Sequence, residues 1–138
     1  MTTVLISLPG QPIPKGRPKF ASINGRAIAY TPKKTRDYEA RLTQEARKAM
    51  AGRPLLTGAL ELTVWAYIGV PKSWSKAKKE RALQGSLRPV TRPDWDNYAK
   101  ITDALNCVIW ADDNQIVTGT VHKFYTNNPR LQVMVQEI

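Results

Sequence analysis

The chain has 138 residues, of which 42% are hydrophobic, and a formal net charge of +10. This length fits one domain over residues 1–138 with a buried core, and the hydrophobic fraction argues against global disorder. No run of about eighteen apolar residues occurs, so we expect no membrane-spanning helix and no membrane partner. The single cysteine and single histidine exclude an internal disulfide, a Cys/His zinc site and a His-based catalytic triad, and they fit a reducing, cytoplasmic location.

The positive charge is concentrated in the first two-thirds of the sequence. Residues 1–60 carry eleven Lys or Arg against three acidic residues, and residues 61–90 carry six against two. Residues 91–138 reverse the balance, with four against six. A basic surface suits a polyanion such as nucleic acid, but basic charge alone is equally typical of ribosome-associated and membrane-surface proteins.

The N-terminal part of the chain predicts a strand, a basic loop and a hairpin. Residues 4–8 alternate in hydropathy and end at a Pro-Gly pair, which is typical of a short strand followed by a turn. Residues 11–20 are rich in proline, which favours a stiff, extended loop. The cations that this loop displays are Lys15, Arg17 and Lys19. Residues 20–30 predict a hairpin that turns at Asn24-Gly25.

A second basic loop, residues 31–35, leads into the first predicted helix. Its cations are Lys33 and Lys34. Thr35 can N-cap a helix that runs to about Met50, because apolar side chains recur there at helical spacing. These side chains are Tyr38, Leu42, Ala46 and Ala49.

The middle of the chain predicts a central strand and a short charged helix. Residues 60–70 alternate in hydropathy and end before Pro71, which favours a strand in the middle of a sheet. Ser73 or Ser75 can then cap a short helix to Leu83. We interpret its many cations as a solvated face.

The C-terminal part predicts one further helix and two strands. Asp96 is placed to N-cap a helix over residues 97–108, and residues 115–125 and 130–135 alternate as strands do. Together the elements predict an α+β domain, in which a small mixed β-sheet packs against two main helices and carries a basic N-terminal hairpin.

Five of the eleven acidic residues fall within twenty positions of this basic chain. They are Asp94, Asp96, Asp103, Asp112 and Asp113. Crowded carboxylates repel one another unless a cation neutralises them, and oxygen ligands suit Mg²⁺. Asp94 and Asp96 share one face of an extended segment and meet the positive end of a helix dipole. Asp113 follows the far end of the same helix, so it joins them only if the chain folds back.

Each acidic motif has a simpler explanation when it is taken alone. The pattern D-x-D-N is common as a turn with an N-cap, Asp112-Asp113 as a polar turn, and Asp103 as an ion-pair partner of Lys100. The joint occurrence favours a metal-dependent enzyme that acts on nucleic acid. In that enzyme Lys100, four residues after Asp96, could stabilise developing negative charge as a point charge.

These motifs also form one long pattern. It comprises Arg92-Pro93-Asp94-x-Asp96-Asn97-x-x-Lys100, then Asp103-Ala104-Leu105-Asn106, then Trp110-x-Asp112-Asp113-x-Gln115-Ile116-Val117. The pattern resembles the RusA family of Holliday junction resolvases, and residues 14–18 and 30–35 are similar to the phage and prophage branch of that family. Trp95 departs from it, because the family usually has an aliphatic residue there.

The resemblance implies a Mg²⁺-dependent homodimeric endonuclease that resolves four-way DNA junctions by paired symmetric nicks, with Mn²⁺ as a substitute metal and no small-molecule cofactor. It implies a bacterial cytoplasmic protein from a phage or prophage. The implied metal ligands are Asp94, Asp96, Asp113 and Asp112, with Lys100 as a further catalytic residue. The expected DNA contacts are Lys15, Arg17, Lys19, Lys33, Lys34 and Arg92. The alternatives are a non-catalytic DNA-binding protein with a structural cation, and a metal-dependent nuclease for flaps or other branched DNA.

Overall fold

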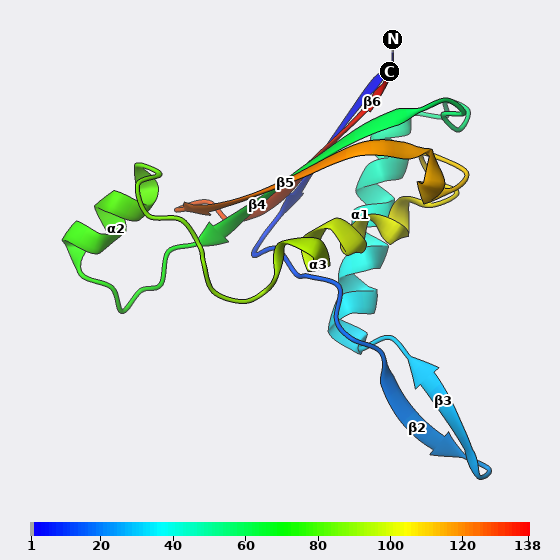
Figure 1. The fold of residues 1–138 in the computed structure, drawn as a ribbon, viewed down its shortest axis with the longest axis horizontal. Helices are drawn as coiled ribbons and strands as arrows, with labels where there is room; N and C mark the ends of the chain where they lie inside the picture. The colour runs from blue at the N-terminus through cyan, green and yellow to red at the C-terminus, as the bar shows by residue number, and fades with distance from the viewer. Residues whose placement is uncertain (1) are drawn as a thin grey trace.

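The computed structural model describes residues 2–138 as a twisted four-stranded sheet with helices on one face and a separate two-stranded hairpin (Figure 1). The strands of the main sheet are β1 (Thr3–Pro9), β4 (Leu60–Gly69), β5 (Ile116–Thr126) and β6 (Arg130–Glu137). The helices are α1 (Lys33–Met50), α2 (Lys76–Leu83) and α3 (Trp95–Lys100), with 3-10 turns η1 (Ile101–Leu105) and η2 (Asp113–Gln115). The predicted α+β class and mixed sheet are confirmed, with three helices in place of two main ones.

The sheet has the order β1-β6-β4-β5, so β4 is an inner strand, as its sequence predicted. It pairs in parallel with β5 and antiparallel with β6, which in turn pairs antiparallel with β1. Alternate side chains of β4 are buried under the helix layer, among them Leu60, Leu62, Val64 and Ala66. The strands β1 and β5 are the two edges of the sheet.

Helix α1 is the main support of the sheet. Its buried stripe contains Tyr38, Leu42, Ala46 and Met50, and the helix ends at Ala51 in the left-handed conformation with φ of 50°. The predicted N-cap was wrong by three residues: Pro32, not Thr35, occupies the N-cap, and Lys33 and Lys34 lie in the first turn. A proline is tolerated at a helix start because the first N–H groups have no helical partner.

The helix predicted over residues 97–108 is shorter and starts earlier. Asp94, not Asp96, occupies the N-cap of α3, which ends at Lys100 and continues as the 3-10 turn η1. The Thr102 hydroxyl donates to the carbonyl of Ala99 at 2.6 Å. Such a side-chain bond competes with regular helix, which explains the tighter turn. After η1 the chain turns so that the fully buried Trp110 can donate its indole N–H to the side chain of Asn106.

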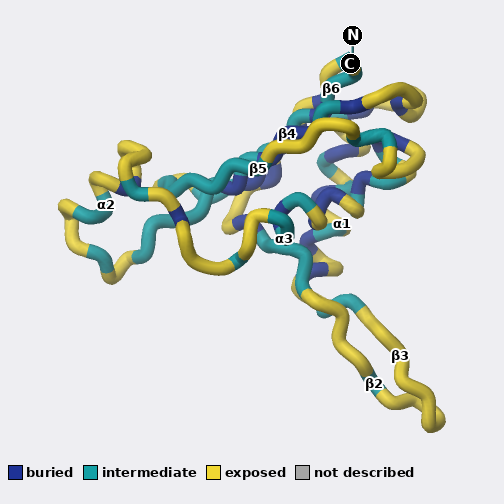
Figure 2. Tube along the Cα trace, in the orientation of Figure 1, coloured by how far each residue is buried: buried dark blue, intermediate teal, exposed yellow. Residues whose placement is uncertain are grey.

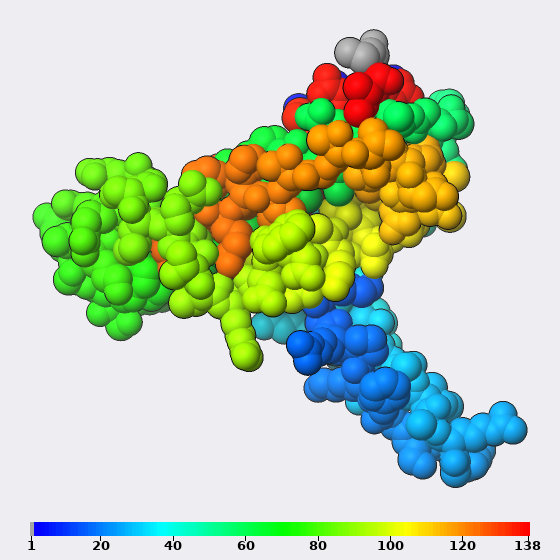
Figure 3. Space-filling model, viewed as in Figure 1, coloured from blue at the N-terminus to red at the C-terminus, as the bar shows by residue number. Residues whose placement is uncertain are grey.

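The predicted hairpin forms an arm that projects from the body (Figures 1 and 3). It consists of β2 (Lys19–Ile23) and β3 (Arg26–Tyr30), and we call residues 19–30 the hairpin arm. Its turn lies at Asn24 and Gly25, both with positive φ, as the sequence predicted. Figure 2 shows that the arm is exposed along almost its entire length. An isolated two-stranded hairpin is marginally stable in water, so its order depends on what it contacts.

The remaining helix, α2, lies at the opposite end of the molecule (Figure 1). The Ser75 hydroxyl accepts a hydrogen bond from the amide of Lys78 at 3.2 Å, so Ser75 is the N-cap. Only Ala82 of this helix is buried, which agrees with a solvated charged surface. Within residues 2–138, no helix combines the length and the apolar character that crossing a membrane requires.

Candidate active site

The first acidic residues of the motif lie at the start of α3. Asp94 occupies the N-cap position, but its carboxylate makes no capping hydrogen bond and is exposed. The Asp96 carboxylate lies 3.3 Å from the ammonium of Lys100, one turn later on the same helix. The side chains of this pair are 44% and 58% exposed, so the pair adds little to stability. The carboxylate of Asp94 therefore does not cap the helix and is available to bind a ligand.

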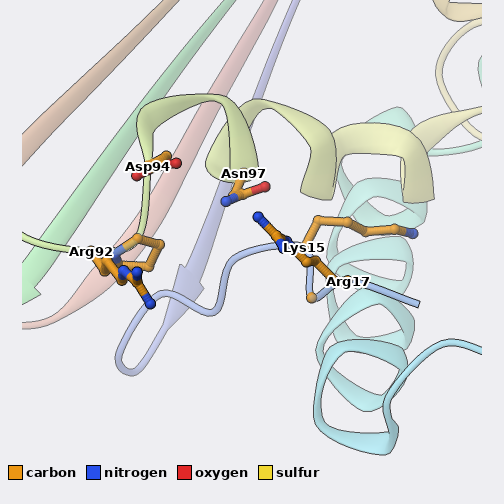
Figure 4. Close-up of a pocket in the computed structure, with 7 residues that line it drawn as sticks. Lys15, Arg17, Arg92, Asp94 and Asn97 are labelled. Atoms are coloured by element: carbon orange, nitrogen blue, oxygen red, sulfur yellow. The ribbon is translucent and has the colours of Figure 1, made fainter. Parts of the chain in front are cut away.

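The proline-rich loop packs against this helix start and forms a pocket of about 720 Å³ with it. The amide of Lys15 donates to the carbonyl of Asn97 at 2.9 Å, and the amide of Gly16 donates to the hydroxyl of Thr35 at 3.1 Å. In Figure 4, Arg92 lies on one side of the pocket and the loop with Lys15 and Arg17 on the other, with Asp94 and Asn97 at the start of α3. The loop thus brings cations to the acidic motif from a distant part of the sequence.

The basic side chains expected to contact DNA differ in their exposure and in whether they form ion pairs. Contrary to the expectation of a displayed side chain, the Lys15 ammonium lies 2.9 Å from the Glu39 carboxylate and the side chain is 26% exposed. Lys33 forms an exposed pair with Asp37 at 3.7 Å. The other four expected cations are exposed, namely Arg17, Lys19, Lys34 and Arg92. Lys15 therefore ties the loop to α1, while its neighbours face solvent.

A second pocket, of about 540 Å³, opens on the other side of Asp94. It is lined by Val90, Thr91, Arg92, Asp94, Trp95, Asp96 and Lys123. Burial lowers the pKa of the Lys123 ammonium, and the charge of Asp94 partly offsets this effect. The Trp95 side chain is 63% exposed at this pocket, so the departure from the family pattern places an aromatic surface between the two acids.

The second acidic pair lies at η2, where Asp112 has a structural role. Its carboxylate accepts from the amide of Asn114 at 3.0 Å, and its own amide donates to the side-chain carbonyl of Gln115 at 3.1 Å. These bonds form a capping box. A side-chain hydrogen bond with Asp112, partial desolvation and the charge of Asp103 raise the pKa of the exposed Asp113 carboxyl. Asp103 thus acts on Asp113, while the ion-pair partner of Lys100 is Asp96.

The two acidic sets lie apart within one chain. Asp94 is close to Lys123, whereas Asp113 comes directly before the start of β5 at Ile116. Ile116 and Lys123 are seven residues apart on β5, which corresponds to about 23 Å in an extended strand. Among residues 2–138, no three Asp, Glu, His or Cys side chains gather closely enough to hold a metal ion. The available ligands are carboxylate oxygens, which suit Mg²⁺. The Asp94 carboxylate makes no capping hydrogen bond, and the raised pKa of Asp113 reflects neighbouring negative charge that a cation would neutralise.

The sequence interpretation missed Lys123 and Arg88. Lys123 donates to the backbone immediately before Asp94, and Arg88 donates from Nε to the carbonyl of Lys123 at 2.8 Å. The sequence contained one indication for Lys123. It lies two residues after Val121 on the same strand, so its side chain starts on the same face of the sheet as Val121, which packs against the core. No sequence signal identified Arg88, because its partner is a backbone atom of a distant strand.

Comparison with known proteins agrees with this arrangement of motifs. The chain is 39% identical to the uncharacterized protein YqaN of Bacillus subtilis (strain 168) over 143 residues, which cover 100% of this chain and 99% of that protein. A family model described as endodeoxyribonuclease RusA matches residues 9–136, and this range includes the proline-rich loop and both acidic sets. The chain therefore belongs to the RusA endodeoxyribonuclease family.

Proposed function

We propose that this protein is a Mg²⁺-dependent homodimeric endonuclease that resolves four-way DNA junctions by paired symmetric nicks. The observation that carries the proposal is the Asp94 carboxylate: it is free of capping bonds, exposed, and set in a pocket lined by Arg17 and Arg92. Membership of the RusA family supports a junction-cleaving activity. The cations beside the acids suit a phosphate backbone, whose contacts come mainly from Arg and Lys.

Each residue of the site has a distinct role in this proposal. Asp94, Asp96 and Asp113 hold the metal, and Asp112 fixes the turn that presents Asp113. When bound, Mg²⁺ supplies Lewis-acid activation of the phosphate and lowers the pKa of an attacking water. Lys100 offers its ammonium to the charge that develops on the phosphate or the leaving oxygen. Product ends with a 5′-phosphate and a 3′-hydroxyl are expected.

The separation of the two acidic sets supports the dimer. Because Asp113 lies about 23 Å along β5 from the neighbourhood of Asp94, one chain does not bring them to one metal ion. A second copy related by a two-fold axis can place its Asp113 beside Asp94 and Asp96 of the first, and the symmetry creates two such sites. Two equivalent sites match two equivalent strands of a four-way junction.

The edge strand β5 offers a surface for this contact. Residues 117–120 are exposed, and β5 is the last strand of the sheet. An exposed edge strand is a template for pairing with another chain. Antiparallel pairing of residues 117–120 in two copies would direct the two β5 strands in opposite directions. The Asp113 end of one copy would then approach the Lys123 and Asp94 end of its partner.

Cleavage of defined DNA substrates tests the reaction. Labelled four-way junction, duplex, flap and single strand would be incubated with Mg²⁺ or EDTA. Wild type should nick opposite strands of the junction only with Mg²⁺, and Asp96→Asn should bind the junction without cutting. Asp37→Asn, which removes an exposed carboxylate of α1, is the matched control and should cut normally. Preferential cutting of flaps would indicate a nuclease for other branched DNA, and binding without any cutting would indicate a non-catalytic protein.

Complementation between inactive variants tests the shared site. Asp96→Asn and Asp113→Asn would carry different tags, be co-expressed, and be purified through both tags as the mixed dimer. If the acids come from two copies, the mixed dimer contains one intact site and nicks one strand of the junction. If each site lies within one chain, both sites of the mixed dimer are damaged and no nick appears.

A further inference from the structure

Lys123 binds the backbone that leads into the acidic motif. Its ammonium donates to the carbonyl of Thr91 at 2.9 Å and to the carbonyl of Pro93 at 2.7 Å. Both bonds are charge-assisted, and such bonds are shorter and stronger than those between neutral groups. The side chain starts from β5, opposite Ala66 of the inner strand, so its base is anchored in the main sheet.

Arg88 ties the same segment to β5 at a second point. Its Nε donates to the carbonyl of Lys123 at 2.8 Å, and its guanidinium lies 3.7 Å from the centre of the Phe124 ring. The chain from Arg88 to Pro93 forms no helix or strand of its own. These side-chain contacts therefore hold an otherwise irregular segment against the edge of the sheet.

The held segment ends directly before Asp94, so it sets the backbone position from which the Asp94 side chain starts. Asp94 directly follows Pro93, and its side chain has no capping bond that would fix it to α3. Within residues 2–138, the Lys123 ammonium forms no ion pair with Asp94, and its hydrogen bonds go to the carbonyls of Thr91 and Pro93. The charges of Lys123 and Asp94 attract each other only at longer range. Partners that orient a metal ligand typically contribute ten- to a hundredfold to metal affinity or activity, as a rough guide.

We propose that Lys123 is a positioning residue, which fixes the Asp94 carboxylate for metal binding by holding the two carbonyl groups before it. The inference rests on the proposed metal-dependent cleavage. It differs from a role as a phosphate anchor, because a lysine whose N–H groups are bound to carbonyls has fewer donors left for DNA.

The test compares Lys123→Met with Lys76→Met. Methionine keeps the apolar stem and removes every N–H donor, and Lys76 supplies the same loss of charge from an exposed position on α2. Four quantities would be measured for each variant: amide hydrogen exchange over residues 88–97, Mn²⁺ affinity by electron paramagnetic resonance, junction affinity in EDTA, and kcat with saturating junction. Lys123→Arg, which retains donors, tests rescue.

We expect Lys123→Met to exchange faster over residues 88–97, to bind Mn²⁺ about tenfold more weakly or worse, and to lose kcat by a similar factor. Junction affinity should match that of Lys76→Met, and Lys123→Arg should recover part of the Mn²⁺ affinity. Unchanged exchange and Mn²⁺ affinity would overturn the proposal. Equal losses in junction affinity and turnover would also overturn it, since they indicate a phosphate anchor.

Two outcomes separate this inference from the proposed function. If wild type cuts no junction, the proposed function fails, while hydrogen exchange over residues 88–97 still decides whether Lys123 holds the segment. If Lys123→Met does not fold, Lys123→Gln, which keeps a shorter amide donor, replaces it. That variant should show smaller changes of the same sign, and wild-type values would overturn the proposal.

Discussion

At the scale of single residues, Lys100 combines a weak ion pair with the chemical role that we propose for it. Its pair with Asp96 is exposed on both sides, so the pair contributes little to the free energy of unfolding. Its position one turn after Asp96 nevertheless sets a positive charge beside the acids. Any large effect of removing it should therefore be on the reaction and not on the fold.

Lys100→Ala should reduce kcat about a hundredfold, because a positioned charge that stabilises the reacting group is lost. Junction affinity and thermal stability should remain close to wild type. The control is Lys48→Ala, which removes a similar exposed pair with Glu45 at 3.2 Å on α1. Single-turnover cleavage and gel-shift titration measure the two quantities. Equal losses in affinity and rate would assign Lys100 to DNA binding alone.

Two buried tyrosines lead us to expect that the free energy of unfolding falls at alkaline pH. Burial raises the pKa of both Tyr38 and Tyr98 from 10.0 to about 12. Below pH 10 both residues are neutral in the folded and unfolded states, so they have no effect. Between pH 10 and 12 the unfolded state loses these protons first, and the free energy of unfolding falls. Tyr98→Phe should make this fall less steep in urea denaturation at several pH values, and an identical pH dependence would contradict the assignment.

At the scale of elements, the contact between the proline-rich loop and α1 depends on Gly16. A Cβ at this position would lie 2.8 Å from the Thr35 hydroxyl, the group that accepts from the Gly16 amide. The loop also bonds to α3 through Lys15 and Asn97. The loop is therefore a bridge between the two helices, and its displacement would move the wall of the pocket beside Asp94.

Gly16→Ala should lower the free energy of unfolding by about 1–3 kcal/mol through overcrowding, and it should weaken junction binding as the loop shifts. Gly58→Ala is the matched control, because a Cβ at Gly58 would meet no atom within 4 Å. Chemical denaturation and junction titration provide the measurements. A Gly16 variant that behaves like the Gly58 variant would mean that the loop adapts without cost.

Local patterns predicted the elements better than their ends. The hairpin turn at Asn24-Gly25 and the inner strand β4 depend on neighbouring residues, so the sequence contained the necessary information. The cap of α2 was narrowed to Ser73 or Ser75, and the structure shows Ser75. The role of the Thr35 side chain could not be predicted from neighbouring residues, because its hydroxyl accepts a hydrogen bond from the amide of Gly16, nineteen residues away. Likewise α3 ends early for a local reason, while the fold-back after it depends on burying Trp110.

The acidic motif was readable from spacing, but its arrangement in space was not. Spacing predicted the proximity of Asp96 and Lys100, which the structure confirms at 3.3 Å. It could not show that Asp113 lies at the far end of β5 from Asp94, because that separation depends on the path of the chain between them. Nor could it show the paired state of Lys15, whose partner Glu39 belongs to α1.

At the scale of the whole molecule, the proposed dimer predicts an asymmetry between the two sheet edges. Val117 on β5 and Leu5 on β1 are both exposed aliphatic residues, at 63% and 67%. Val117→Lys should convert the dimer to monomer in analytical ultracentrifugation and abolish cleavage, because a lysine on an edge strand opposes pairing. Leu5→Lys should leave both unchanged. Dissociation by Leu5→Lys alone would place the interface at β1.

The hairpin arm has a consequence for how the protein meets DNA. Because the arm is almost entirely exposed within residues 2–138, we expect part of its conformational entropy to be lost only when the arm docks on DNA. This loss of entropy lowers the affinity for DNA. The flexibility of the free arm, in turn, allows it to adapt to DNA junctions whose branches meet at different angles. A protease that cuts after Arg26 should accordingly act quickly on free protein and slowly on the junction complex. In that case the hairpin arm becomes ordered only when the protein binds branched DNA, and its resistance to the protease distinguishes the bound protein from the free protein.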